Sequence, residues 1–182
     1  MFQDKMATPA IPERVYTLCK IVEKKPTTLS DLKEKMEPSY LNQTSSYFSE
    51  YRSAAEELKL ISVSDSMVSL AVDSKIVKTT DSMRQYINGM LEEFGAGQFY
   101  LVTKKYYELG NKVLTGEKNV AELAPIISNL ISRPVDAPAM RSWRFWMSFL
   151  GLGYLQDMFI IPNADTFLAD IINIVGFGKN QR

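Results

Sequence analysis

The chain has 182 residues, of which 46% are hydrophobic and 11% aromatic, so it can bury one large core or two compact cores of about 80 residues each. Its 21 basic and 21 acidic side chains cancel, and they also cancel within residues 1–80 and within 81–182, which excludes a basic arm or an acidic tail. The absence of histidine removes the commonest general base and metal ligand, and the single cysteine, Cys19, excludes an internal disulfide.

Three helices and a hairpin are predicted in the first part of the chain. Pro12 suits the first turn of a helix over 12–25. Thr28 is placed as the N-cap of a short second helix that ends at 37–38. A third helix is expected to begin near Thr44 or Ser45. Its predicted inner side consists of Tyr47, Phe48, Tyr51, Ala54, Ala55 and Leu58. Alternation over 61–63 and 68–70, around a turn at 64–66, predicts a β-hairpin.

A connector helix is predicted next. Thr80 or Asp81 can cap it, and apolar residues follow at helical spacing as far as Phe94. The Gly-Ala-Gly sequence at 95–97 ends this helix, and it is either a hinge or a simple helix end.

The second half of the chain repeats the first. A shift of 92 positions places residues 52–68 on 144–160 without a gap, and a shift of 91 places 28–32 on 119–123. Self-similarity at a fixed offset is typical of a duplicated structural unit. It predicts helices over 99–114, 119–131 and 138–150, then a second hairpin with strands at 154–155 and 159–161. A final helix over 164–174 is expected, with 176–182 loose.

Three helices followed by a two-stranded hairpin resemble the winged-helix variant of the helix-turn-helix. The predicted fold is therefore mainly α with short β-hairpins. It has a winged-helix domain at 1–78, a connector helix at 79–97 and a second winged-helix-like domain at 98–182. The resemblance implies that the third helix of each domain enters the DNA major groove and that the hairpin is the wing.

Candidate DNA contacts follow from the outward faces of these third helices. In the first domain they are Ser45, Ser46, Ser49, Arg52 and Ser53, although Glu56 and Glu57 oppose a polyanion and the face can equally be a solvated one. In the second domain Arg141 and Arg144 point outward, next to Phe145 and Phe149. Arginine beside aromatic side chains suits DNA and suits a protein interface equally, so Phe145 and Phe149 are the candidate partner-binding residues. Trp143 and Trp146 are predicted to be core.

Two further resemblances concern the role of such a protein. The architecture is similar to the kite-type subunits of structural-maintenance-of-chromosomes complexes. The stretch 144–153 looks like small winged-helix proteins of prokaryotic DNA-modification and phage-defence clusters. These likenesses imply either a DNA-associated regulator or complex subunit, with a possible role in antiviral defence, or a protein–protein adaptor.

An enzyme is not expected. Cys19 lies on the predicted inner face of the first helix, and the Gly-x-Gly pairs lack the rest of a phosphate-binding motif. The expectation is a non-catalytic protein without cofactor or metal whose partners are duplex DNA, a protein partner or a second copy of itself. A lone cysteine and an N-terminus unlike a signal peptide predict the cytoplasm. Charged residues within the most apolar stretch, 143–161, argue against a membrane span.

Overall fold

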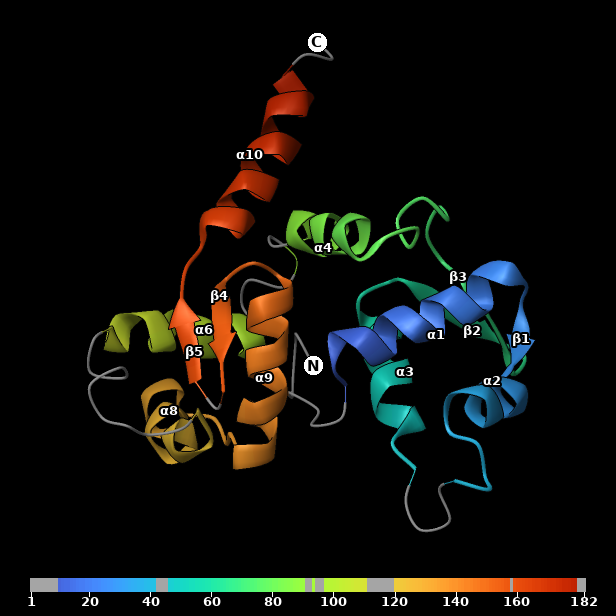
Figure 1. Cartoon of the computed structure of the whole chain (residues 1–182), viewed down its shortest axis with the longest axis horizontal. Helices are drawn as coiled ribbons and strands as arrows, with labels where there is room; N and C mark the ends of the chain where they lie inside the picture. Colours follow the sequence, from blue (N-terminus) through green and yellow to red (C-terminus); the bar gives the residue numbers. More distant parts are fainter. Residues whose placement is uncertain are drawn as a thin grey trace. The chain divides into compact units, whose positions relative to one another are not determined.

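The computed structural model describes residues 10–41, 46–90, 93, 97–110, 120–157 and 159–179. This part of the chain is mainly helical, with eight α-helices and two small antiparallel sheets (Figure 1). It divides into two compact units: the described residues up to Met83, called here the first unit, and those from Arg84 onward, called the second unit. None of its helices combines the length and the hydropathy that a membrane span requires.

The helices of the first unit begin and end close to their predicted limits, with one exception. They are α1 (Pro12–Lys24), α2 (Leu29–Met36) and α3 (Phe48–Glu57). The predicted N-cap of α2 is confirmed, because the Thr28 hydroxyl accepts a hydrogen bond of 3.1 Å from the backbone N–H of Asp31. The exception is α3, which begins at Phe48. Tyr47 therefore precedes this helix and is 47% exposed, contrary to its predicted burial.

A three-stranded sheet completes the first unit. The predicted hairpin is present as β2 (Ile61–Ser64) and β3 (Met67–Leu70), and β1 (Thr27–Thr28) pairs with the other side of β3. The sheet order is thus β1-β3-β2. Asp65 and Ser66 both have positive φ, at 49° and 64°, which is the geometry of a type I′ hairpin turn. The two-residue strand β1 was not predicted, because it is too short to show alternation.

The connector begins as predicted, with α4 (Thr80–Gly89), and the boundary between the units falls inside this helix. Met83 and Ile87 are buried, as their spacing predicted. Leu91, Phe94 and residues 95–96 of the predicted break lie outside the described residues. Gly97 is the N-cap of the next helix.

Among the described residues of the second unit, three α-helices lie between α4 and the hairpin. They are α6 (Gln98–Leu109), α8 (Ala124–Ile131) and α9 (Ala137–Phe149), and a short 3₁₀ helix, η1 (Val120–Leu123), precedes α8. Helix α6 ends earlier than predicted, because Gly110 takes a positive φ of 51°. The single helix predicted over 119–131 is instead η1 followed by α8. Pro125 explains this break, because it lacks the N–H that a continuous helix would use.

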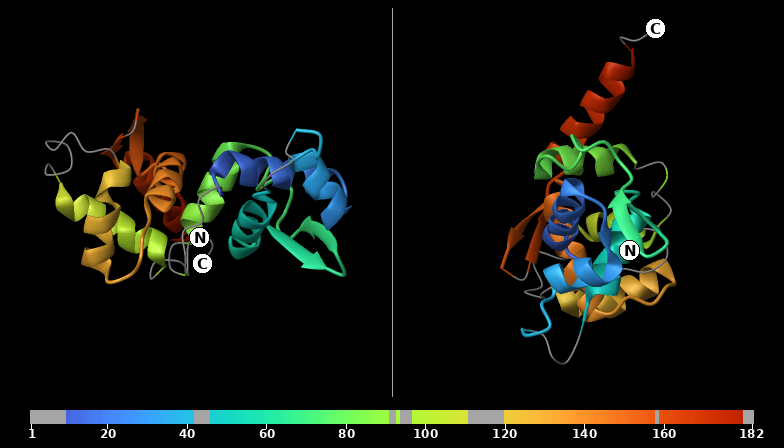
Figure 2. Two further views of the ribbon diagram at one scale, coloured as in Figure 1. Left: turned by 90° about the horizontal axis from the view of Figure 1, so that it is seen from below. Right: turned by 90° about the vertical axis from the view of Figure 1, so that its right-hand side faces the viewer.

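The hairpin and last helix of the second unit are β4 (Gly153–Gln156), β5 (Phe159–Pro162) and α10 (Asp165–Lys179). The hairpin packs beside α9 (Figure 2). Residues 176–179 were predicted to be loose, but they continue α10. The two glycines at 176 and 178 therefore do not end the helix, although glycine lowers helix propensity.

The predicted offset of 92 residues recurs in the backbone itself. The limits of β2 and β3 plus 92 are the limits of β4 and β5. The turn after the third helix also recurs. Leu60 N–H donates to the Ala55 carbonyl at 2.9 Å, and Leu152 N–H donates to the Met147 carbonyl at 2.8 Å. Positive φ is found at 59 and 65 and again at 151 and 157. The part of the predicted repeat that contains the third helix and the hairpin is therefore repeated in the structure as well as in the sequence.

Large aromatic side chains fill the core of the second unit. Trp143 and Trp146 are fully buried, as predicted, and Trp143 packs edge-on against Tyr106 with ring centroids 4.8 Å apart. The Trp143 indole donates to the Thr103 hydroxyl at 3.0 Å, and the Tyr106 hydroxyl donates to the Ile160 carbonyl at 2.6 Å. These hydrogen bonds tie α6 to α9 and to the hairpin, so the outward face of α9 is held on a rigid base.

Candidate nucleic-acid interface

Helix α9 has one fully buried face and one that carries arginine. The Asp136 carboxylate accepts a hydrogen bond of 2.7 Å from Ala139 N–H and so caps the start of the helix. The predicted inner residues are all buried: Met140, Trp143, Trp146, Met147 and Leu150. Arg141 lies on the opposite side and is exposed. Among the described residues, no carboxylate pairs with it.

Arg144 links α9 to the hairpin. Its side chain is half-buried, and it donates a hydrogen bond to the backbone carbonyl of Asp157 in the β4–β5 turn. Its guanidinium carbon also lies 4.9 Å from the centre of the Phe145 ring. Arg144 therefore fixes the turn relative to the helix and is only partly available to a ligand, in contrast to Arg141.

Helix α3 has a different surface. Ser49 and Ser53 are exposed, as predicted. Arg52 is half-buried and pairs with Glu56 on the same helix, with 2.8 Å between Nη1 and Oε2. Its charge is thus already partly neutralised within the chain.

The 92-residue correspondence allows the charges of α3 and α9 to be compared position by position. Three carboxylates of α3, at 50, 56 and 57, correspond to Ser142, Ser148 and Phe149 of α9, and Ser49 corresponds to Arg141. Helix α3 carries three acidic side chains and one basic one, whereas α9 carries two arginines and no acidic side chain. Of the two predicted DNA-contacting helices, only α9 is positively charged.

Ser45 lies outside the described residues, and Ser46 precedes α3. The Ser46 hydroxyl donates to the Glu37 carboxylate at 2.6 Å, and the Tyr47 N–H donates to the same carboxylate at 3.1 Å. The prediction that Ser46 lies on the outer face of the third helix is therefore wrong. Its hydroxyl closes the connection between α2 and α3, because Glu37 is buried at the end of α2 and requires hydrogen-bond donors.

Glu37 is the centre of a polar cluster in the first unit. Burial alone would raise the pKa of its carboxyl, but hydrogen bonds from Ser46 and the Tyr47 backbone, together with the nearby Tyr51 hydroxyl and Arg14, lower it below its ordinary value. Arg14 lies 3.5 Å from Glu37 and over the Tyr51 ring. Burial, and then the negative charge of Glu37, raise the pKa of Tyr51. The cluster joins α1, α2 and α3, which gives it a structural role.

The two predicted partner-binding residues are half-buried. Phe149 packs edge-on against Trp146, with ring centroids 5.7 Å apart. It also lines a pocket of about 290 Å³ together with Arg84, Ser148 and Tyr154. Phe145 lies under the Arg144 guanidinium. Both aromatic side chains therefore contribute to packing and present only part of their surface.

Arg133 was missed by the sequence analysis. It is exposed in the five-residue turn that joins α8 to α9, after Ser132 has ended α8 with a left-handed φ of 53°. In a helix-turn-helix this connection lies beside the third helix. No sequence pattern marks Arg133. It could have been identified only from its place in the turn between the second and third helices of the unit.

Cys19 is fully buried, as predicted, and burial raises the pKa of its thiol to about 12. No group of three acidic or cysteine side chains within the described ranges is placed to hold a metal ion.

No protein-family model, curated protein or solved structure matches the chain.

Proposed function

We propose that the chain is a non-catalytic, DNA-associated protein built from two winged-helix domains, and that the second of these domains contacts duplex DNA through α9. The order helix, strand, helix, helix, hairpin in the first unit, with sheet order β1-β3-β2, supports the winged-helix assignment. The recurrence of the helix and hairpin 92 residues later supports a second domain of the same kind.

The observation that carries the DNA assignment is the difference in charge between α3 and α9. A helix that enters a DNA groove approaches phosphates on both sides, so its cations gain and its carboxylates lose binding free energy. Helix α9 offers an exposed arginine and has no carboxylate between Ala137 and Phe149, and the turn before it adds Arg133 beside the capping Asp136. Helix α3 offers an arginine that is already bound to a glutamate. The proposed DNA-contacting set is therefore Arg133, Arg141 and the exposed part of Arg144.

The expected salt dependence can be worked out from this set. Each neutralised phosphate contributes about −0.9 to the slope of log affinity against log salt concentration. Arg133 and Arg141 together predict a slope of about −1.8, which is roughly a tenfold loss of affinity between about 50 and 200 mM salt. Because the whole chain is neutral, we expect weak binding by a single copy.

Fluorescence anisotropy on a mixed-sequence duplex tests the proposal. Arg141→Gln should weaken binding and bring the salt slope about one unit closer to zero. The matched control is Arg52→Gln, which removes the same charge from α3 and should leave both quantities unchanged. Salt-dependent binding that both variants weaken equally would show that α9 is not the contact. The absence of binding by the wild type at about 50 mM salt would overturn direct DNA binding.

A second candidate function is that of an adaptor which holds a partner protein through Phe145 and Phe149. The observation in its favour is the stacking of Arg144 on Phe145 at a partly exposed site, since arginine and aromatic residues are enriched in protein interfaces. Under this alternative the chain has no DNA binding of its own, and Phe145→Asp abolishes copurification of a stoichiometric partner. Under the DNA-binding proposal, the double variant Arg141→Glu, Arg144→Glu abolishes duplex binding instead.

A further inference from the structure

A small polar pocket lies where the end of α9, the start of β4 and the start of α10 meet. Its volume is about 290 Å³, which is close to that of roughly ten water molecules, so it admits a molecule with a single ring. All of its lining residues belong to the second unit. They are Arg84, Ser148, Phe149, Gly151, Gly153, Tyr154, Asn163 and Thr166, and we call this feature the α9–α10 pocket.

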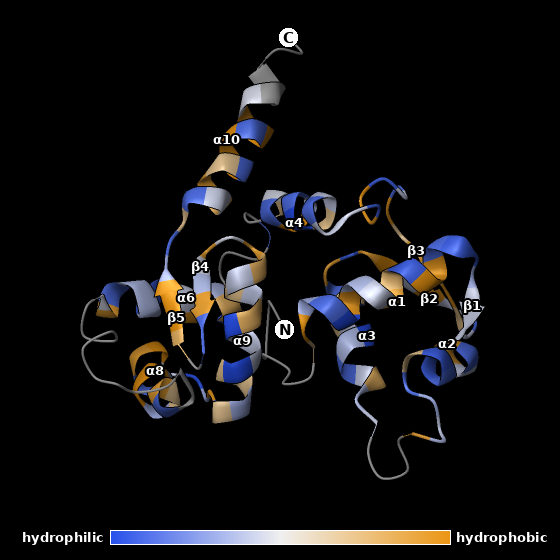
Figure 3. Cartoon of the chain, in the orientation of Figure 1, coloured by the Kyte–Doolittle hydropathy of each residue, from blue (hydrophilic) through white to orange (hydrophobic). Residues whose placement is uncertain are grey.

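Backbone contacts fix the walls of the α9–α10 pocket. The Phe167 N–H donates to the Gly151 carbonyl at 3.2 Å and so joins α10 to the turn after α9. The Asn163 side-chain oxygen accepts from the Asp165 N–H at 2.9 Å. Figure 3 shows the link between β5 and α10, which holds Asn163, as hydrophilic. The pocket is therefore part of the folded unit and has a polar wall.

Three lining residues carry hydroxyl groups, and they come from three different elements. Ser148 belongs to α9, Tyr154 to β4 and Thr166 to α10. None of these hydroxyls has a hydrogen-bond partner among the described residues. Because a hydroxyl can both donate and accept, a molecule in the pocket meets donors and acceptors on several sides.

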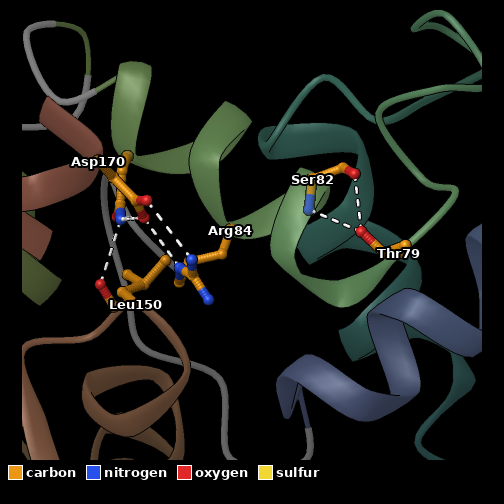
Figure 4. A network of polar contacts seen from close by, with 6 residues as sticks. Thr79, Ser82, Arg84, Leu150 and Asp170 are labelled. Atoms are coloured by element: carbon orange, nitrogen blue, oxygen red, sulfur yellow. Dashed lines mark hydrogen bonds and ion pairs between the residues drawn. The ribbon is translucent and has the colours of Figure 1, made fainter. Parts of the chain in front are cut away.

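The charges around the pocket cancel. Among the described residues that line it, Arg84 alone carries a charge, and its Nε lies 2.8 Å from the buried Asp170 carboxylate (Figure 4). The last turn of α9 and the first turn of α10 contribute helix dipoles of opposite sign. An anion or a cation would therefore gain little from this site, and the mixture of donors and acceptors favours a neutral molecule.

An exposed aromatic ring completes the lining. Tyr154 is 57% exposed, so its ring gains little from burial in its own chain. The 92-residue correspondence places Ser62 at the same position of the first hairpin, which shows that the helix–hairpin fold does not require an aromatic residue there. Together with Phe149, Tyr154 offers the pocket a flat surface on which a ring can stack.

We propose that the α9–α10 pocket binds a small neutral ring compound with several hydrogen-bonding groups, which is either a sugar ring or a planar heterocycle. The face of the ring packs on Tyr154, and its polar groups pair with the hydroxyls of Ser148 and Thr166. A ligand of this size has few atoms, so we expect a dissociation constant on the order of 1 mM. The proposal involves neither Arg141 nor DNA, and its failure would leave the proposed function standing.

Two-dimensional ¹H–¹⁵N NMR of the whole chain tests the site, with glucose and uracil as probes. The amide signals of Gly151 and Gly153 report on the pocket directly. At least one probe should shift these signals. A shift with glucose identifies a sugar ring as the ligand class, and a shift with uracil identifies a planar heterocycle. The charged analogues, glucose 6-phosphate and orotate, should bind no more tightly than glucose and uracil.

Two variants test the lining. Tyr154→Ser gives the second hairpin the residue of the first and should raise the dissociation constant at least roughly fivefold, because the ring loses its stacking surface. Thr166→Val removes a hydroxyl with little change of shape and should raise it roughly threefold. The matched control is Leu155→Ser, since Leu155 follows Tyr154 on the opposite face of β4, is 40% exposed and does not line the pocket. This variant should bind the probe like the wild type.

Three results would each overturn the proposal. The first is the absence of any shift of the two glycine signals with either probe up to roughly 20 mM. The second is tighter binding of a charged analogue than of its neutral counterpart, which would contradict the balance of charge. The third is a Tyr154→Ser variant that binds the probe as tightly as the wild type does.

Discussion

The polar cluster around Glu37 gives the sharpest prediction about stability. Glu37→Gln keeps the size of the side chain but removes the charge that accepts hydrogen bonds from Ser46 and from the Tyr47 backbone. Glu37 is only 8% exposed, and hydrogen bonds to a charged group contribute about 1.5–3 kcal/mol. The amide oxygen retains part of this interaction, and the ion pair with Arg14 adds little, because Arg14 is 44% exposed. We therefore expect the free energy of unfolding to fall by about 1–2 kcal/mol.

Urea denaturation followed by far-UV circular dichroism measures this change. The matched control is Glu34→Gln on the same helix, where an exposed carboxylate accepts hydrogen bonds from the backbone N–H and the hydroxyl of Ser39. This control should change the free energy of unfolding by less than about 0.5 kcal/mol. The reasoning is refuted if Glu37→Gln is no more destabilising than Glu34→Gln.

The dependence on pH provides a second test of the same cluster. Because the pKa of Glu37 is lower in the folded chain than in the unfolded chain, folding favours the ionised form. Its stabilisation is complete above the unfolded pKa, about 4.3, and is lost as the pH falls through the lowered folded value. The difference in unfolding free energy between the wild type and Glu37→Gln should therefore be constant from about pH 7 to 5 and should shrink below about pH 4.

Two further predictions concern other buried groups. Asp170→Asn should lower the unfolding free energy by about 2–3 kcal/mol, because it leaves the Arg84 guanidinium, only 18% exposed, without its carboxylate. Tryptophan fluorescence in urea measures this change, since both tryptophans lie in the second unit, and an unchanged midpoint would contradict it. Cys19 should react with a thiol reagent at pH 8 only after denaturant is added, because its thiol is buried and its pKa is about 12. Rapid labelling of the folded chain would contradict the burial of Cys19.

Much of the fold could be predicted from local signals in the sequence. Apolar spacing together with Pro12, Thr28 and Pro138 located the starts of α1, α2 and α9, because proline and an N-cap threonine favour the first turn of a helix. The 92-residue shift located the second hairpin to within one residue at each end, because a hairpin register is determined by its turn. The early end of α6 at Gly110 and the break at Pro125 have local causes, but two other misplaced elements depend on contacts between distant residues. Strand β1 forms only against β3, and the start of α3 depends on Glu37 of the preceding helix.

The candidate site was less predictable than the fold. A helical wheel identifies the residues that point outward, but it does not show what each of them binds. Arg52 and Arg144 occupy equivalent positions, yet Arg52 pairs with a glutamate one turn later, whereas Arg144 reaches the carbonyl of Asp157. The difference follows from position 56, a glutamate whose counterpart at 148 is a serine. The Arg52–Glu56 pair follows from its i,i+4 spacing, but the partner of Arg144 becomes visible only once the hairpin is placed beside the helix.

The two copies agree where the backbone requires it and differ where the surface is free to change. Lys59 and Gly151 both have positive φ after the third helix, which lets the chain turn sharply into the hairpin. At 151 the residue must be glycine, because an added Cβ would lie 2.6 Å from the Thr166 Cβ. At the equivalent position 59, the first copy has a lysine with the same sign of φ. The outward positions are under no such restriction, and there Glu56 and Glu57 of α3 correspond to the uncharged Ser148 and Phe149 of α9. Because the shared features are explained by folding, the difference in charge between α3 and α9 is the place to test the proposed function.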